Sequence, residues 1–170
     1  HGIDLEIKPG EKIAIVGATG AGKSTLINLL SRFYDFEKGS IDLDNHSIKE
    51  FTLKSLRKHV NIVLQDVFLF ADTIFNNITP FNPDVKPETV YEAARQIGVH
   101  QFIESLPGGY DYNVKERGVM LSSGQRQLIA FLRVYISDPS VLILDEATSS
   151  IDYHSEELIK NATHKITANK

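Results

Sequence analysis

The chain contains no cysteine among its 170 residues, so it can form neither disulfide bonds nor thiolate metal sites. Its six histidines are scattered, and none shows the paired spacing of a zinc-binding helix. No apolar run approaches the roughly 20 residues of a membrane-spanning helix, and no signal peptide is visible. A formal net charge of −4 gives no basic excess that would indicate binding to nucleic acid. If the protein works at a membrane, we expect another segment or chain to supply the spanning part.

Two short, wholly apolar runs, residues 13–16 and 141–144, carry the clearest structural signal. Runs of this kind are typical of strands that are buried on both faces of a parallel sheet. Other segments show the period-2 alternation of strands or the 3.6-residue spacing of helices. They predict strands over 3–7, 41–43 and 61–64, and helices over 26–33, 90–97, 102–106, from 122 or 123 to about 138, and from about 154.

Strands that alternate with helices around two buried strands predict an α/β fold with a parallel sheet. Residues 67–138 are mostly helical in pattern and are predicted to form an inserted α-helical subdomain. Residues 1–66 and 139–170 would then form the core. Both ends of the sequence begin or stop within such patterns, and we therefore expect the chain to be a fragment of a longer protein.

A glycine-rich loop follows the first apolar run. Residues 17–24 match the pattern G-x-x-x-x-G-K-[ST] completely. Glycines let the backbone curl so that successive N–H groups point at phosphate oxygens, and the helix that follows adds its positive N-terminal end. We expect Lys23 to reach the β- and γ-phosphates, Ser24 to bind Mg²⁺ and Thr25 to support the α-phosphate. The predicted phosphate-binding residues are Gly17, Ala18, Thr19, Gly20, Ala21, Gly22, Lys23, Ser24 and Thr25.

An acidic pair ends the second apolar run. Asp145 comes directly after residues 141–144, and Glu146 follows it. Asp145 suits a carboxylate of the Mg²⁺ shell. Neighbouring side chains diverge in an extended chain, so Glu146 can take a different task and polarise the attacking water. The alternative is a strand that simply ends in solvated acidic residues. The complete phosphate loop in the same sequence favours the Mg²⁺ and water-polarising roles over this alternative.

Three further motifs make the sequence similar to the ATP-binding-cassette (ABC) ATPases. Residues 121–125, Leu-Ser-Ser-Gly-Gln, resemble the L-S-G-G-Q signature of that family, about 20 residues before the acidic pair as in the family. Residues 149–152 resemble its D-loop, and Gln65 resembles its Q-loop glutamine. The resemblance implies a P-loop NTPase (RecA-like) core, ATP and Mg²⁺ as cofactors, and a head-to-tail dimer with two ATP molecules at the interface.

The resemblance also implies a role for each matched residue. Glu146 and Gln65 would be catalytic, and Ser24, Gln65 and Asp145 would form the Mg²⁺ site. The signature would contact the γ-phosphate of a nucleotide held by a second nucleotide-binding domain, because a helix N-terminus offers free N–H groups to an anion. The residues expected to act on the partner's nucleotide are Ser122, Ser123, Gly124, Gln125 and Asp152.

The sequence departs from the family pattern at three places. Ser123 stands where the signature usually has Gly, and no aromatic residue precedes Gly17 to stack on adenine. The switch histidine of the family follows one more strand after the D-loop. His154 is too close to Asp152, and His164 has no strand before it, so neither is assigned.

Residues 115–118, Lys-Glu-Arg-Gly, resemble the x-G-E-R-G element of ABC exporters. Phe68, Leu69 and Phe70 are either subdomain core or a partly exposed socket for a coupling helix of a transmembrane domain. We therefore expect an exporter-type ATPase domain at the cytoplasmic face of the cell membrane, attached through a membrane domain outside this chain. The alternatives are a soluble ABC ATPase that acts on DNA or ribosomes, which should carry basic inserts or a second cassette, and a regulatory nucleotide-binding module that does not hydrolyse ATP. Glu146 speaks against the regulatory module, because degenerate sites commonly lose that residue.

Overall fold

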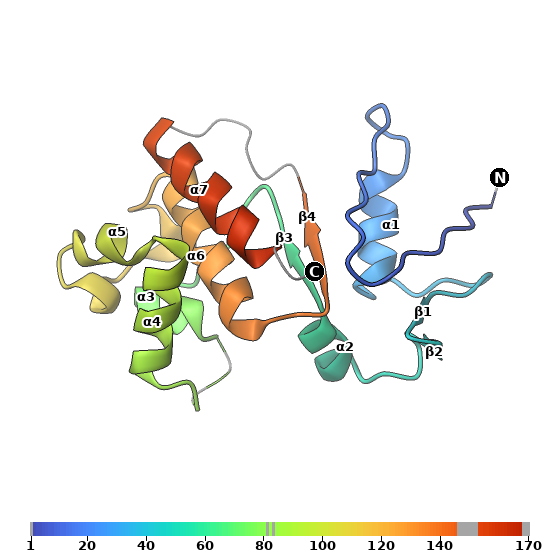
Figure 1. Cartoon of the computed structure of the whole chain (residues 1–170), viewed down its shortest axis with the longest axis horizontal. Helices are drawn as coiled ribbons and strands as arrows, with labels where there is room; N and C mark the ends of the chain where they lie inside the picture. The colour runs from blue at the N-terminus through green and yellow to red at the C-terminus, as the bar shows by residue number, and fades with distance from the viewer. Residues whose placement is uncertain (1, 81, 83, 146–152, 168–170) are drawn as a thin grey trace.

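The computed structural model describes residues 2–80, 82, 84–145 and 153–167. A two-stranded parallel sheet lies between two groups of elements. β3 (Val60–Val63) pairs with β4 (Val141–Leu144) in register, from Val60 opposite Val141 to Val63 opposite Leu144. In Figure 1 the helices α3 to α7 stand on one side of this pair, and α1, β1 and β2 stand on the other.

Most of the remaining elements are helices. Before β3 lie α1 (Lys23–Leu30), the antiparallel pair β1 (Asp42–Leu43) and β2 (His46–Ser47), and α2 (Leu53–His59). Between β3 and β4 lie α3 (Ile74–Ile78), α4 (Pro87–Ile97), α5 (His100–Glu104), the 3₁₀ turns η1 (Gly109–Asp111) and η2 (Glu116–Gly118), and α6 (Ser123–Ser137). The last element is α7 (Tyr153–Ile166).

The sheet separates two apolar clusters. Successive side chains of a strand point to opposite faces, and β4 follows this rule. Leu142 and Leu144 pack against a large cluster that includes buried residues of α3 to α7, whereas Val141 and Ile143 pack against a small cluster of Ile48, Leu56 and Val60. The large cluster contains most of the buried apolar side chains, and α6 lies at its centre, in contact with α3, α4 and α7.

Most of the expected elements are present. The strands over 61–64 and 141–144 and the helices at 26–33, 90–97, 102–106 and 154 correspond to β3, β4, α1, α4, α5 and α7, with ends shifted by a few residues. The expected strand over 41–43 appears as β1, which has only two residues. α6 begins where the sequence predicted, with Ser122 as its N-cap.

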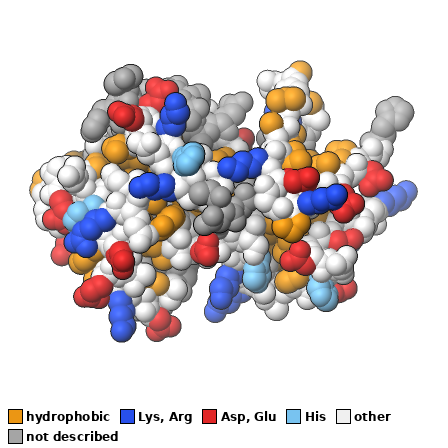
Figure 2. All heavy atoms as spheres, in the orientation of Figure 1, with side chains coloured by type: hydrophobic (Ala, Val, Ile, Leu, Met, Phe, Trp, Pro, Cys, Tyr) orange, Lys and Arg blue, Asp and Glu red, His pale blue; other side chains and the backbone are white. Residues whose placement is uncertain are grey.

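The strands predicted over 3–7 and 13–16 are wrong for this structure, which has no regular secondary structure there. A strand needs a neighbour that takes up its N–H and C=O groups, and the only backbone-to-backbone hydrogen bond of this segment within the described residues joins Glu11 N to Lys8 O. Its apolar side chains are exposed, with Val16 at 88%. Figure 2 shows apolar surface around the part of the molecule that carries α1. An apolar run predicts burial, but it does not supply the neighbouring strand.

The predicted division into a core and an inserted subdomain stays a prediction. α3 to α6 all lie within residues 67–138, and both strands of the parallel sheet lie outside them. The large apolar cluster nevertheless runs across the predicted boundary, because it also takes in residues of β3, β4 and α7.

Candidate functional site

The phosphate loop wraps the N-terminus of α1 in an open, solvent-exposed turn. Gly20 and Gly22 have φ values of 83° and 92°, a left-handed conformation that favours glycine. Gly22 is the N-cap of α1 and offers no side-chain acceptor to the first turn. The first intrahelical bond runs from Leu26 N to Gly22 O, so the N–H groups of Lys23, Ser24 and Thr25 have no backbone acceptor within the described residues. Such a row of N–H groups at a helix N-terminus suits an anion.

Lys23 folds back over this loop. Its Nζ donates hydrogen bonds to the carbonyl oxygens of Gly17, at 2.7 Å, and Ala18, at 3.0 Å. The ammonium group thus lies against the concave backbone of the loop, while Ser24 and Thr25 remain exposed in the first turn of α1. A lysine ammonium has three donors, so one proton remains for a phosphate oxygen without loss of these two bonds.

Gln65 and Asp145 emerge at one edge of the sheet. The backbone N–H of Asp145 donates to Val63 O at 2.9 Å, so the parallel pairing of β3 and β4 extends by one bond beyond the strands. Gln65 follows β3 by two residues, and Asp145 is half-buried directly after β4. Parallel pairing therefore brings these two predicted site residues to the same carboxyl edge, although they are 80 positions apart in the sequence.

The phosphate loop lies toward the same end of the molecule. In Figure 1 the loop before α1 lies toward the end of the view at which β4 has its carboxyl terminus. No hydrogen bond joins the side chain of Lys23 or Ser24 to Asp145 in the part of the chain that the structure describes. Glu146 and Asp152, predicted as the water-polarising base and the D-loop aspartate, lie outside the described residues.

The predicted signature forms the start of α6. The Ser122 Oγ accepts from Gln125 N at 3.2 Å, and the Gln125 Oε1 accepts from Ser122 N at 2.9 Å. This reciprocal capping box fixes the helix N-terminus and contributes about 1 kcal/mol for the serine cap alone. Ser122 and Ser123 are exposed, whereas Gly124 is buried. The signature therefore presents a rigid helix N-terminus to solvent at a distance in sequence from the phosphate loop.

A family model described as "ABC transporter" matches residues 1–149. The chain belongs to the ABC transporter family. The expected P-loop NTPase fold and the ATPase assignment are thereby confirmed.

Similar proteins agree with this family. A putative multidrug export ATP-binding/permease protein of Staphylococcus aureus (strain NCTC 8325) is 49% identical over 160 residues, which cover 94% of this chain and 28% of the relative. The protein YgaD of Bacillus subtilis (strain 168), with the same description, is 45% identical over 170 residues, or 100% of this chain and 29% of the relative. The structure of a bacterial Atm1-family ABC exporter with ATP bound matches with a TM-score of 0.89 and 40% identity, over 100% of this chain and 30% of the other. The chain spans less than a third of the length of these relatives.

Next to the ABC signature, the turn over residues 115–118 makes a close contact with two other segments. A Cβ added to Gly118 would lie 2.9 Å from the Leu69 Cδ1 and 3.1 Å from the Arg126 Cδ, and Gly118 also has a φ of 67°. Only glycine fits such an approach without a shift of its neighbours. This turn therefore packs at once on the segment after Gln65 and on the first turns of α6.

The Phe68–Phe70 segment divides between the two alternatives that the sequence left open. Leu69 is fully buried, whereas Phe68 is 55% exposed and Phe70 is 43% exposed. The two rings lie 5.2 Å apart at 87°, an edge-to-face pair on the surface. Beside them an open hollow of about 800 Å³ is lined by Phe70, Ala71, Asp72, Phe75, Asn76, Thr79, Pro80 and Asn82. Leu69 is thus core, Phe70 lines the hollow, and the exposed ring of Phe68 packs edge-to-face against Phe70.

A buried amide that sequence reasoning missed supports this surface from below. Asn77 is 0% exposed; its Oδ1 accepts from Phe70 N at 2.8 Å, and its Nδ2 donates to Phe70 O at 3.1 Å and Thr73 O at 2.9 Å. The Nε of Arg133, on α6, donates to Asn77 O at 2.8 Å, and burial lowers the pKa of this arginine. The Asn77-Ile78-Thr79 triplet reads as a chance glycosylation pattern, so the sequence contains no signal for this role.

Asp72 stands at the rim of the same hollow. Its Oδ1 accepts from the Asn76 Nδ2 at 2.8 Å and from Thr73 N at 2.7 Å. These bonds, that from the Asn76 side chain first, hold the pKa of Asp72 below its usual value. The rim therefore carries a carboxylate that stays ionised at neutral pH.

No helix among the described residues is both long enough and apolar enough to cross a bilayer.

Proposed function

We propose that this chain is the ATP-hydrolysing domain of an exporter-type ABC transporter. The observation that carries the proposal is the exposed phosphate loop with the Lys23 ammonium held against its backbone by the carbonyls of Gly17 and Ala18. The relatives named above are exporters. They favour this role over a soluble ABC ATPase acting on DNA or ribosomes and over a regulatory module without turnover.

In the proposed mechanism, each residue of the site has one task. The N–H groups of the loop and the ammonium of Lys23 bind the phosphates and offset their charge. Gln65 and Glu146 act on the water, with Glu146 as the base that polarises it for attack on the γ-phosphate. The oxygen of the water forms a bond to the γ-phosphorus while its proton passes to Glu146, and the bond from the γ-phosphorus to the bridging oxygen breaks, so that this oxygen leaves on ADP.

Ser24, at the start of α1, and the two residues at the sheet edge fit a magnesium ion. The Ser24 hydroxyl, the Asp145 carboxylate and the Gln65 amide are hard oxygen donors, which Mg²⁺ prefers, and Mg²⁺ is commonly held by one or two carboxylates plus substrate phosphates. The described residues contain no cluster of three or more His, Cys, Asp or Glu that could hold a metal without a phosphate ligand. When bound, Mg²⁺ would supply positive charge that offsets the negative charge of the phosphates.

We further propose that the site is completed by a second nucleotide-binding domain. Ser122, Ser123, Gly124 and Gln125 start α6 as a capped helix N-terminus on the surface, which suits the γ-phosphate of a nucleotide held by the partner. Asp152 would lie at the seam between the two domains. Each ATP molecule would then join a phosphate loop of one domain to a signature of the other.

The hollow beside Phe68 and Phe70 is the proposed docking surface for coupling helices of a transmembrane domain. Two exposed aromatic rings next to a concave surface suit an apolar helix. The word "permease" in the names of the relatives supports a membrane partner. The domain would accordingly work at the cytoplasmic face of the cell membrane.

The test is the effect of Lys23→Ala on the affinity of this chain for ATP in the presence of Mg²⁺. Loss of a charged donor to phosphate is expected to weaken binding at least about 10-fold, since such a bond is worth about 1.5–3 kcal/mol. Lys38→Ala, at an exposed lysine outside the loop, should leave the affinity unchanged. A folded Lys23→Ala variant with undiminished affinity in a calorimetric titration would contradict the proposal.

A further inference from the structure

The helix that follows the phosphate loop, α1, buries few of its side chains. Of the residues of α1, only Ile27 is buried. Both Lys23 and Ser24 belong to the first turn of this helix, so any tilt of α1 moves them. Their position relative to the sheet edge therefore depends on what holds α1 at its other end.

The C-terminus of α1 has an arginine at a position where helices usually have glycine. Arg32 N donates to Leu29 O at 3.1 Å and Phe33 N donates to Asn28 O at 2.9 Å, the paired bonds of a Schellman motif. Arg32 occupies the left-handed position of this motif with a φ of 47°. Glycine is usual there because it has no Cβ. A side chain at this position must therefore be compensated by its contacts.

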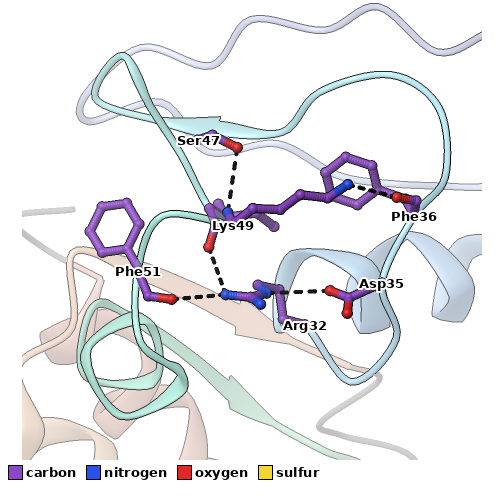
Figure 3. Close-up of polar contacts among 7 residues, drawn as sticks. Arg32, Asp35, Phe36, Ser47, Lys49 and Phe51 are labelled. Atoms are coloured by element: carbon purple, nitrogen blue, oxygen red, sulfur yellow. Dashed lines mark hydrogen bonds and ion pairs between the residues drawn. The ribbon is translucent and has the colours of Figure 1, made fainter.

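The Arg32 side chain makes those contacts with a distant segment. Its Nη1 donates to Ile48 O at 3.0 Å and to Phe51 O at 2.9 Å, and its Nε lies 3.6 Å from the Asp35 Oδ1. Figure 3 shows the guanidinium inserted between the end of α1 and the connection from β2 to α2. The Arg32 side chain is 16% exposed, whereas that of Asp35 is 76% exposed. The two backbone carbonyls are thus its principal partners.

Lys49 makes a second tie nearby that does not reach the helix. Its Nζ donates to Phe36 O at 2.8 Å and lies 4.0 Å from the centre of the Phe36 ring. This contact joins the same two stretches of chain beyond the end of α1 (Figure 3). Replacement of Lys49 therefore serves as a control, because it removes a contact between the same two stretches of chain without removing any contact of α1.

The segment that Arg32 holds is fixed to the sheet. Ile48 is 2% exposed and belongs to the small apolar cluster, against which Val141 and Ile143 of β4 pack. Asp145 follows that strand directly. A continuous path of contacts therefore runs from α1 through Arg32 and Ile48 to the strand that ends at Asp145.

We propose that Arg32 is a positioning residue that sets where Ser24, at the start of α1, stands relative to Asp145. The inference rests on the proposed Mg²⁺–ATP site, in which these two residues share one ion. The phosphate loop and Lys23 move with α1 as a unit, so binding of the phosphates alone does not depend on the tie. Binding of Mg²⁺ depends on the tie made by Arg32, because one proposed ligand, Ser24, lies at the start of α1 and the other, Asp145, follows β4.

The experiment compares Arg32→Gly with the unmodified chain. Glycine keeps the left-handed backbone and removes only the side chain. The dissociation constant for ATP is measured by titration with Mg²⁺ and with EDTA, and the ratio of the two constants reports the gain in affinity from Mg²⁺. This gain is expected to fall about 10-fold in Arg32→Gly, because a displacement of ~1 Å at a site can cost up to ~10²-fold. The affinity in EDTA is expected to stay within about 2-fold, because the loop is intact.

Asp35→Asn and Lys49→Met are the matched controls, and both should keep the full gain from Mg²⁺. Arg32→Lys, which keeps the charge but not the planar fork, should give an intermediate gain; it replaces Arg32→Gly if circular dichroism shows that variant to be unfolded. An unchanged gain in a folded Arg32 variant overturns the inference and leaves the proposed function intact. Absence of any gain from Mg²⁺ in the unmodified chain instead overturns the proposed metal site and the inference together.

Discussion

Replacement of Asn77 by alanine tests how the surface beside Phe68 and Phe70 is supported. The change removes the Oδ1 that accepts from Phe70 N and the Nδ2 that donates to Phe70 O and Thr73 O. The two carbonyls keep other donors, because Asp72 N also donates to Phe70 O and Asn77 N also donates to Thr73 O. The main loss therefore falls on the N–H of Phe70.

The structure sets the size of this effect. Loss of the acceptor for a part-buried N–H costs about 1–3 kcal/mol, and each carbonyl that keeps one donor loses about 0.5 kcal/mol. The sum is a decrease of about 3 kcal/mol in the free energy of unfolding. At about 2–4 °C per kcal/mol for a chain of this size, the Tm should fall by about 6–12 °C.

The assay is thermal unfolding followed by circular dichroism, together with hydrogen exchange of the Phe70 amide. Asn76→Ala is the matched control, because Asn76 is the preceding residue of α3 and is exposed, and among the described residues its side chain hydrogen-bonds only to the Oδ1 of Asp72. It should cost less than about 1 kcal/mol. Equal Tm values for the two variants, or an unchanged exchange rate at Phe70 in Asn77→Ala, would refute the reasoning.

Three further predictions concern the chemistry, the docking surface and pH. Glu146→Gln should keep ATP binding and lower turnover by a factor of about 10² or more; hydrolysis at a near-normal rate by a purified variant would reject Glu146 as the base. Phe68→Asp should leave ATP affinity unchanged and weaken association with the membrane domain in a protein that contains both, as pull-down can measure; if the variant unfolds instead, Phe68 is a packing residue. Burial first, and then the charge of Glu104, raises the pKa of Tyr110 from its ordinary value of 10.0 to about 12. The unfolded chain therefore loses this proton first, stability should fall as pH rises from about 10 to about 12, and the urea midpoint of Tyr110→Phe should change less over that range.

A last prediction is that this chain alone binds ATP but turns it over slowly. The signature for each nucleotide is expected from a second domain, and each missing transition-state donor typically costs about 10²–10³ in rate. Steady-state ATPase activity per molecule is to be compared with that of a longer chain extended at both ends. Equal activities would show that the additional elements are dispensable and would bring His154 and His164 back as candidates for the γ-phosphate contact.

Much of the candidate site could be predicted from the sequence, because its motifs are formed by residues that are close together in the chain. The phosphate loop depends on glycines at particular positions and on a helix that begins at Lys23, and both features are contiguous in the sequence. The same holds for the capping box of Ser122 and Gln125, whose partners are three residues apart. For such features the physical cause lies within a few residues, so the pattern is sufficient.

The sequence by itself determined the family, the phosphate loop, the signature cap and the α/β alternation, because each rests on contacts between near neighbours. The tertiary structure alone decided which apolar runs become strands, since 141–144 pairs in parallel with β3 whereas 13–16 has no strand partner among the described residues. It also decided that Leu69 is core while Phe68 is exposed, and that Asn77 and Arg32 each hold a segment distant from their own. Long-range pairing of backbone groups depends on which surfaces meet when the chain folds, and no local pattern of residues encodes that choice.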